Sequence, residues 1–154
     1  MMDKKHVLKG ALSIAQVSDS TYKEFQKKSE ELIQKMNTYM LQRPDLDKLV
    51  GEKNVIMMKD NHANHVRFIA AMLKNHNADV LLETVLWVFR AYRSHGFATN
   101  YWAAQLNGWM AILNENLSPD SYYEVLPYYE WMQINIPMFV LLSDEKLEAT
   151  FSMH

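Results

Sequence analysis

The chain contains no cysteine among its 154 residues. Disulfide bonds, thiolate metal ligands and cysteine nucleophiles are therefore excluded. The sequence also lacks a glycine-rich phosphate loop and a G-x-S-x-G motif, which are common local signatures of phosphate binding and of serine hydrolases. We predict that the protein is not an enzyme, and that it resides in the cytoplasm, since a cysteine-free chain is compatible with a reducing compartment.

Glycine and proline are scarce, with four residues of each. Proteins built from many short strands need these residues in their tight turns, so an all-β fold is disfavoured. Apolar residues instead recur three and four positions apart in several long segments, which is typical of amphipathic helices. The sequence predicts an all-α fold in which residues 1–154 form a single globular bundle of about six helices; a globin-like bundle is one form it could take.

Neither an excess of charge nor a long apolar run is present. Lysine and arginine number 16 against 18 acidic residues, for a net charge of −2, so the basic field that attracts nucleic acid is missing. No segment approaches the roughly 18 uncharged apolar residues that a membrane span requires. We therefore expect neither a nucleic-acid partner nor a membrane partner. The first 18 residues are broken by polar positions, and we expect a short helix or a loose N-terminal arm there rather than a signal peptide.

Capping and breaking residues divide the rest of the chain. Pro44 ends a first long helix, because the residue before a proline avoids the helical region. Ser118-Pro119 is a strong helix start, and Pro127 and Pro137 should each kink or divide the last segment. The expected elements are helices over about 19–43 and 52–75, a short turn at 45–50, and helices that begin near residues 78, 100 and 119.

The most informative segment places histidines in an apolar row of the helix over 52–75. His62 and His65 are three residues apart and share one side of a helical turn. Buried polar groups need hydrogen-bond partners, so we expect both imidazoles to be shielded and hydrogen-bonded within the domain. The row consists of Val55, Met58, His62, His65, Ile69, Met72 and His76.

Two functional interpretations of these histidines stand beside the structural one. They could bind a metal together with Asp60, Glu83 or His95, or one of them could ligate haem, although the HExxH spacing of metalloproteases is absent. They could also contact a ligand or sense pH, because a half-buried histidine titrates near neutrality. We expect no metal and no cofactor.

A second cluster lies at the end of the next helix, beside Gly96. Arg90, Arg93 and His95 suit the negative end of a helix dipole, so this cluster could be an ordinary solvated helix end. Arginine also binds carboxylates and phosphates through two parallel hydrogen bonds, which predicts an anion-binding or partner-docking patch instead. Trp87 lies one helical turn before Arg90 and is a further candidate for contact.

Aromatic residues are frequent in the second half of the chain, and an apolar stripe marks the first long helix. Tyrosine and tryptophan at helical spacing are usually core residues, but their polar tips also suit interfaces. We expect some of them to be buried between subunits and therefore predict a homodimer. The stripe, which resembles a coiled-coil seam, consists of Tyr22, Phe25, Ser29, Leu32, Met36 and Tyr39.

Two stretches carry a resemblance to known proteins, DNHANHVRFIAAML at 60–73 and VLWVFRAYRSHGF at 85–97. Together they resemble the helical N-terminal regulatory domains of bacterial multidomain sensors, which precede cobalamin-binding modules. More distantly, the layout is similar to the globin-like N-terminal domain of stressosome scaffold proteins, which binds no haem. The resemblance covers about residues 55–140 and implies no catalytic role. Its characteristic positions are Asp60, His62, His65, Trp87, Arg93 and Gly96.

These observations predict a cytoplasmic, non-catalytic sensor or regulatory domain of a bacterial signalling system. It would respond to a small ligand or a signalling protein by a change in helix packing. The alternative is a helical protein that binds haem or a metal through His62 and His65. A corrinoid is not expected, because the module that would hold it is not part of this sequence. The residues predicted to contact a ligand or partner are Asp60, His62, His65, Trp87, Arg90, Arg93 and His95.

Overall fold

The all-α prediction is confirmed. The computed structural model describes residues 3–152, with the side chains of residues 3–144, and every regular element in that range is a helix. The helices are α1 (Lys4–Leu12), α2 (Asp19–Lys27), α3 (Ser29–Leu41), α4 (Leu46–Val50), α5 (Val55–Lys74), α6 (Ala78–Ser94), α7 (Asn100–Asn116), α8 (Pro119–Ile134) and α9 (Ile136–Ser152).

The described residues thus form nine helices where the sequence predicted about six. One additional helix is α1, and two arise because expected helices are divided. The first long helix breaks at Lys28, because α2 packs against α5 and α8 whereas α3 packs against α5 and α7. The last segment divides at Asn135, just before Pro137, whose ring cannot continue a helix from the preceding turn. Pro127, by contrast, lies inside α8 without dividing it.

The N-terminal segment is not a loose arm. Val7 and Ala11 of α1 are buried, and the helix packs against α6 and α8. The indole nitrogen of Trp131 donates a hydrogen bond to the carbonyl of Val7 at 3.0 Å. His76 Nε2 lies 2.9 Å from the carbonyl oxygen of Ala11, as a hydrogen-bond partner at the other end of the helix. Of the two alternatives for this segment, the packed short helix is therefore the one observed.

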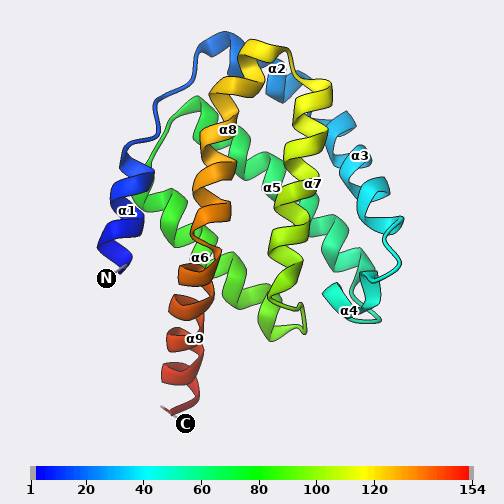
Figure 1. Cartoon of the computed structure of the whole chain (residues 1–154), viewed down its shortest axis with the longest axis vertical. Coiled ribbons are helices and arrows are strands. Elements are labelled where there is room, and N and C mark those ends of the chain that lie inside the picture. Colours follow the sequence, from blue (N-terminus) through cyan, green and yellow to red (C-terminus); the bar gives the residue numbers. More distant parts are fainter. Residues whose placement is uncertain (1–2, 153–154) are drawn as a thin grey trace.

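The helices form two layers. Figure 1 shows α7 and α8 side by side and antiparallel, with α5 and α6 crossing behind them, α1 on one side and α3 on the other. Helix α9 follows α8 and packs along α6. The largest fully buried side chains include Trp109, Tyr101, Tyr128 and Tyr129. These aromatic residues, which the sequence left open as core or interface residues, fill the space between the layers.

Helices α2 and α8 each supply a carboxylate that accepts hydrogen bonds from the N-cap residue of the other helix. The backbone N–H and the hydroxyl of Ser18, the N-cap of α2, donate to the Glu124 carboxylate at 2.7 and 3.0 Å. In return, Ser118, the N-cap of α8, donates its N–H and hydroxyl to Glu24 at 2.6 and 2.8 Å. A carboxylate is favourable at a helix N-terminus, where N–H groups lack helical partners. We call this arrangement the reciprocal cap.

Hydrogen bonding lowers the pKa of both carboxylates in the reciprocal cap. For Glu124, the hydroxyl of Thr21 has the largest effect, followed by the N–H of Ser18. Burial alone would raise the pKa of Glu24, but hydrogen bonds from Ser118 and Ser121 outweigh it and hold that pKa below its ordinary value. Both side chains therefore favour the ionised form that accepts these hydrogen bonds.

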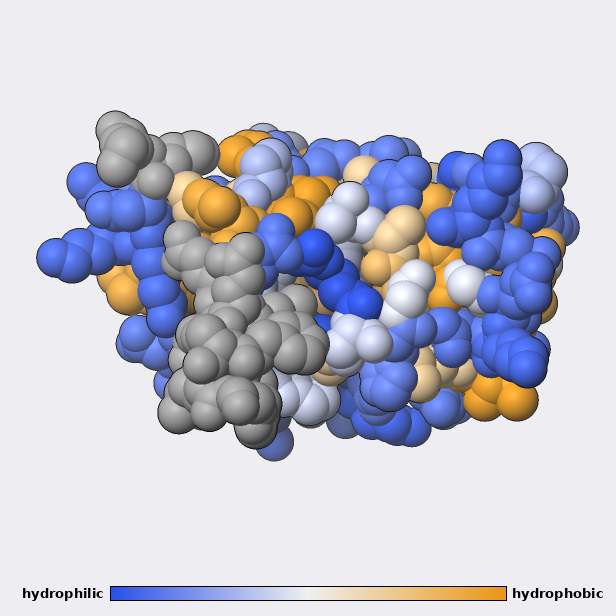
Figure 2. Space-filling view, turned by 90° about the horizontal axis from the view of Figure 1, so that it is seen from below, coloured by the Kyte–Doolittle hydropathy of each residue, from blue (hydrophilic) through white to orange (hydrophobic). Residues whose placement is uncertain are grey.

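One face of the molecule is largely hydrophilic (Figure 2). Figure 2, which views the molecule from below, shows hydrophilic side chains over much of this face, with apolar side chains gathered in patches between them. Among the described side chains, the large apolar ones left exposed include Ile56, Trp87, Tyr123 and Ile134. In the described part of the chain, no helix has the length and apolar character that a membrane crossing needs.

Candidate functional site

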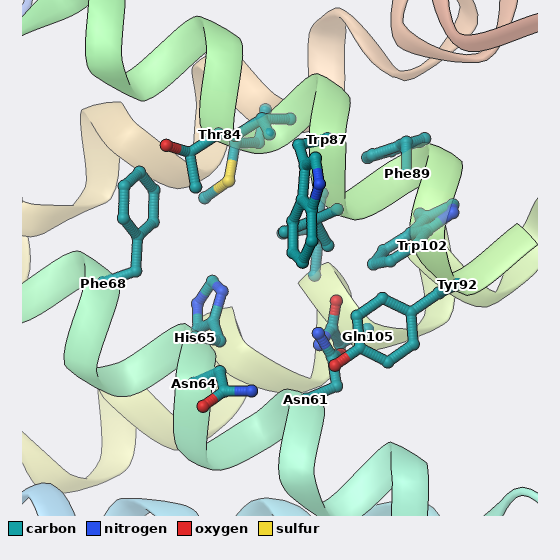
Figure 3. Close-up of a pocket in the computed structure, with 14 residues that line it drawn as sticks. Asn61, Asn64, His65, Phe68, Thr84, Trp87, Phe89, Tyr92, Trp102 and Gln105 are labelled. Atoms are coloured by element: carbon teal, nitrogen blue, oxygen red, sulfur yellow. The ribbon is translucent and has the colours of Figure 1, made fainter.

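A pocket with a volume of about 220 Å³ lies between α5 and α6, and α7 forms its floor. Figure 3 shows side chains from these helices converging on it. The lining residues are Asn61, Asn64, His65 and Phe68 from α5, Thr84, Val85, Trp87, Val88, Phe89 and Tyr92 from α6, Trp102, Gln105 and Leu106 from α7, and Met132 from α8. Most of this lining is aromatic or aliphatic, as is usual for small-molecule sites.

The helical period of α5 decides which of its polar residues reach the pocket. Asn61, His65 and Phe68 lie four and three residues apart and therefore share one face. His62 follows Asn61 by one position and points into the core instead, where it is fully buried. The two histidines that the sequence treated as one site thus have different surroundings.

His65 is held in a fixed orientation at the edge of the pocket. Its ring stacks on that of Trp109, with centroids 5.0 Å apart and an interplanar angle of 19°. Its Nε2 atom lies 2.8 Å from the hydroxyl of Tyr129. Burial, with a smaller effect of neighbouring His62, lowers the pKa of His65 to about 3. The imidazole is therefore neutral near pH 7.

The hydrogen bond to Tyr129 determines which nitrogen of His65 carries the proton. Burial raises the pKa of Tyr129, so its hydroxyl keeps its proton. Within the described residues, His65 Nε2 is the partner of that hydroxyl. If Nε2 carried the hydrogen, the phenolic proton would lack an acceptor, at a cost of about 1–3 kcal/mol. Tyr129 therefore donates to Nε2, and Nδ1 carries the hydrogen of the ring. Figure 3 shows this ring directed from α5 into the pocket.

A buried amide pair forms the polar part of the floor. Asn61 Oδ1 accepts hydrogen bonds from the Tyr101 hydroxyl at 2.8 Å and from Gln105 Nε2 at 2.6 Å. All three side chains are buried. Figure 3 shows the Gln105 side-chain oxygen directed away from Asn61, toward Trp87. The pair therefore uses the Gln105 nitrogen internally and presents the Gln105 oxygen, a hydrogen-bond acceptor, to the pocket.

His62 lies outside the pocket. Its Nδ1 atom lies 2.7 Å from Asn37 Oδ1, and its ring meets the ring of Trp109 edge-on at 5.9 Å. Burial lowers the pKa of His62 to about 3. Its Nε2 atom is buried and has no hydrogen-bond partner among the described residues. As the sequence predicted, both His62 and His65 are shielded and hydrogen-bonded, each through one ring nitrogen.

The side chains named as further metal ligands do not converge. Asp60 is exposed on α5, and His95 is exposed at the C-cap of α6. Glu83 forms an ion pair with Lys4 at 2.7 Å. No group of three or more histidine, aspartate or glutamate side chains with metal-binding proximity occurs in the part of the chain that the structure describes.

Arg93 binds α9 rather than facing a free surface. Its Nη1 atom lies 2.5 Å from Asp144 Oδ1 and donates hydrogen bonds to Ser143 Oγ at 3.0 Å and to the Val140 carbonyl at 3.3 Å. The acidic partner of Arg93 thus belongs to the same chain, and its role as a docking residue stays a prediction. Arg90 is half-buried on the same helix.

The other candidates at this helix end have separate surroundings. The His95 carbonyl accepts a hydrogen bond from Asn54 Nδ2 at 2.8 Å. Gly96 follows with a φ of +99°, which glycine adopts without strain, as predicted for a helix end. Trp87 lies at the rim of the pocket and is 61% exposed. The candidate residues therefore do not form a single site: His65 and Trp87 belong to the pocket, and the rest do not.

Sequence reasoning missed Asn61, Gln105 and Tyr129. One signal was present for Asn61, a polar residue four positions before His65 and hence on the same helix face. Gln105 also stood out, since α7 is mostly apolar around it. The pairing between them could not be found, because 44 residues separate the two side chains.

No family model, curated protein or solved structure matches the chain. The likeness to helical regulatory domains of bacterial sensors therefore stays a prediction. The function is argued below from the pocket and from the helices that it contacts.

Proposed function

We propose that the protein is a non-catalytic helical sensor or regulatory domain that binds a small molecule in the pocket between α5 and α6. The observation that carries the proposal is the pocket itself. It combines aromatic walls with a few fixed polar groups, those of His65, Asn61 and Gln105. This combination is typical of sites that bind and orient small molecules.

The position of α6 supports a regulatory role. Residues 84–92 of this helix form one wall of the pocket, and the next residue, Arg93, binds Asp144 and Ser143 of α9. A ligand that binds one arrangement of α6 more tightly than another shifts the population toward it. Because α9 packs along α6, that shift would change how α9 is held.

The protonation of His65 supports the non-catalytic part of the proposal. A general base is most effective when its pKa lies near the working pH. Burial instead lowers the pKa of His65 to about 3, so its neutral ring is a weak base. Its role in the proposal is to donate a hydrogen bond from Nδ1.

A library of small neutral compounds tests the proposal by thermal shift. Leu106→Trp places an indole in the pocket and should abolish the shifts caused by true ligands. Tyr123→Trp adds the same side chain at an exposed position of α8 and should leave them unchanged. Ligands that bind should also alter amide hydrogen exchange at residues 136–144 of α9. If no compound distinguishes the two variants, pocket binding is refuted; if compounds bind without an effect on α9, the regulatory coupling is refuted.

The alternative of a haem or metal cofactor has one supporting observation, the buried Nε2 atom of His62, which has no hydrogen-bond partner among the described residues. This nitrogen is enclosed in the core, so a cofactor that used it would require the surrounding side chains to move. Our proposal includes no cofactor. Absorption spectroscopy and elemental analysis of the purified protein decide between the two, because a stoichiometric haem or metal that is lost in His62→Gln would favour the alternative.

The proposal also includes a homodimer in the cytoplasm. The stripe that suggested a dimer is used within the chain, since Phe25, Leu32 and Met36 are fully buried. The remaining support comes from large apolar side chains on the surface, such as Ile56 and Trp87. Cell fractionation with a tagged chain tests the location, and the assembly is treated below.

A further inference from the structure

The size of the pocket limits the ligand to a small ring system. An enclosed apolar cavity of about 150 Å³ binds benzene. The pocket between α5 and α6 has a volume of about 220 Å³, roughly one and a half times as large. By that comparison it holds roughly nine non-hydrogen atoms, which corresponds to one aromatic ring with a three-atom substituent. Phe68 and Trp87 lie on opposite walls and offer aromatic faces or edges to such a ring (Figure 3).

The charge of the lining selects neutral molecules. None of the lining residues is an aspartate, glutamate, lysine or arginine. His65 is neutral near pH 7, since burial lowers its pKa to about 3. A charged group that leaves water for this lining would gain no counter-ion, and burying an unpaired charge is strongly unfavourable. Carboxylates, phosphates and ammonium ions are therefore disfavoured.

Asn64, Thr84 and Tyr92 also bring polar groups to the lining, but hydrogen bonds within the chain fix the role of two polar atoms, one on His65 and one on Gln105. His65 presents an N–H at Nδ1, because Tyr129 occupies Nε2. Gln105 presents its side-chain oxygen, because its nitrogen is bonded to Asn61. A ligand that leaves either atom unpaired on binding loses the hydrogen bond which that atom made to water. The complementary ligand thus carries both an acceptor and a donor.

Resting on the proposed function, we infer that the ligand is a neutral aromatic amide, or a molecule with the same pairing of carbonyl and N–H groups. Its carbonyl accepts from Nδ1–H of His65, and its N–H donates to the side-chain oxygen of Gln105. The ring lies between the aromatic walls. The amide supplies one acceptor and at least one donor without a formal charge. Together with a single ring, it matches the size of the pocket, its uncharged lining, and its donor on His65 and acceptor on Gln105.

Three probes of similar size test this inference on the whole chain by NMR titration: benzamide, acetophenone and benzoate. Acetophenone keeps the carbonyl but replaces the donor by a methyl group, and benzoate adds a charge. Benzamide should bind at least about fivefold more tightly than acetophenone, because a site built to accept a hydrogen bond rejects an analogue that lacks the donor. Benzoate should bind at least about tenfold more weakly than benzamide.

A matched pair of variants tests whether the preference for benzamide over acetophenone arises at Gln105. Gln105→Leu removes the acceptor and should weaken benzamide at least about fivefold while leaving acetophenone unweakened. Gln133→Leu removes an amide outside the pocket, one that is bonded to Asn107 on the surface, and should change neither. Should Gln105→Leu fail to fold, the comparison of the three probes on the native chain still tests whether the ligand is a neutral aromatic amide.

The outcomes separate this inference from the proposed function. Equal binding of benzamide and acetophenone, lost in Leu106→Trp, would overturn the amide class and leave the pocket as a ligand site. Tighter binding of benzoate would overturn the neutral class. If none of the three probes binds, the inference is also overturned, and the compound library with Leu106→Trp then decides the proposed function by itself.

Discussion

At the scale of single residues, His65 shows how burial turns a titratable side chain into a fixed hydrogen-bond donor. The stacked Trp109 ring and the Tyr129 hydroxyl together restrict the ring's orientation and its tautomer. A histidine near the surface would exchange protons around neutral pH. His65 does not, because burial keeps its pKa at about 3.

We therefore predict that the free energy of unfolding decreases as the pH is lowered below about 6.5. The pKa values of His62 and His65 are lowered to about 3 in the folded state, whereas the unfolded chain takes up these protons near pH 6.5. Between these values only the unfolded state is protonated, so the free energy of unfolding is highest above pH 6.5 and decreases toward pH 3. The slope is at most about 1.4 kcal/mol per pH unit for each histidine.

Urea unfolding at pH 7.5, 6 and 5 measures this slope. Below pH 4.5 the decrease should steepen, because the lowered pKa values of Glu24 and Glu124 act in the same direction. A His65→Gln variant should show a smaller slope between pH 7.5 and 5. An unfolding free energy that is constant over this interval would contradict the neutral state of both imidazoles in the folded chain.

The hydrogen bond between Tyr129 and His65 gives a second prediction. Tyr129→Phe should lower the free energy of unfolding by about 1 kcal/mol, the usual net value of an intramolecular hydrogen bond. It should also release the tautomer constraint, so that ¹⁵N spectra of His65 shift from protonation at Nδ1 toward a mixture. Tyr123→Phe, at a position that is 78% exposed, serves as the control and should change neither. An unchanged ¹⁵N spectrum in Tyr129→Phe would refute the tautomer assignment.

At the scale of helices, one half-buried side chain adds polar contacts to the packing of α6 against α9. Arg93 is 18% exposed and binds Asp144. Arg93→Met keeps much of the apolar contact but removes the charge, so hydrogen exchange at residues 136–144 should become faster. The free energy of unfolding should fall by about 1–3 kcal/mol, because hydrogen bonds to charged groups are lost.

Two comparisons control this prediction. Arg90→Met alters the neighbouring half-buried arginine and should leave exchange in α9 unchanged. Asp144→Asn combined with Arg93→Met should destabilise by less than the sum of the single changes, since both remove the same interaction. Strict additivity would show that the two side chains do not act as a pair.

Local signals in the sequence predicted several helix starts and much of the buried face of α5. Of the row from Val55 to His76, the residues Met58, His62, Ile69 and Met72 are buried on α5, and Ser118 starts α8 as predicted. Asn77 caps α6 by accepting a hydrogen bond from the N–H of Val80 at 3.1 Å. The break at Lys28 could not be predicted, because it depends on the different helices against which α2 and α3 pack. The pocket is lined by residues of four helices that are distant in sequence, so only His65 and Trp87 were found in advance.

At the scale of the whole molecule, the exposed apolar side chains bear on assembly. Ile56, Trp87, Tyr123 and Ile134 are each more than half exposed, and where exposed apolar side chains adjoin one another they can form a contact with another chain. Light scattering at micromolar concentration should give about twice the chain mass of 18.1 kDa. A value equal to the chain mass at all accessible concentrations would refute the homodimer.

The reciprocal cap has a consequence for how the chain is made. Ser18 and Glu124 are 106 residues apart, and a ribosome adds about 5–20 residues per second. The first turn of α2 is therefore synthesised roughly 5–20 s before Glu124, the residue whose carboxylate caps it. Until then, Phe25 and the rest of the apolar face of α2 lack α8, one of the two helices that cover them. A nascent chain that stalls before residue 118 would leave this face open, so that binding by a chaperone matters most in that interval.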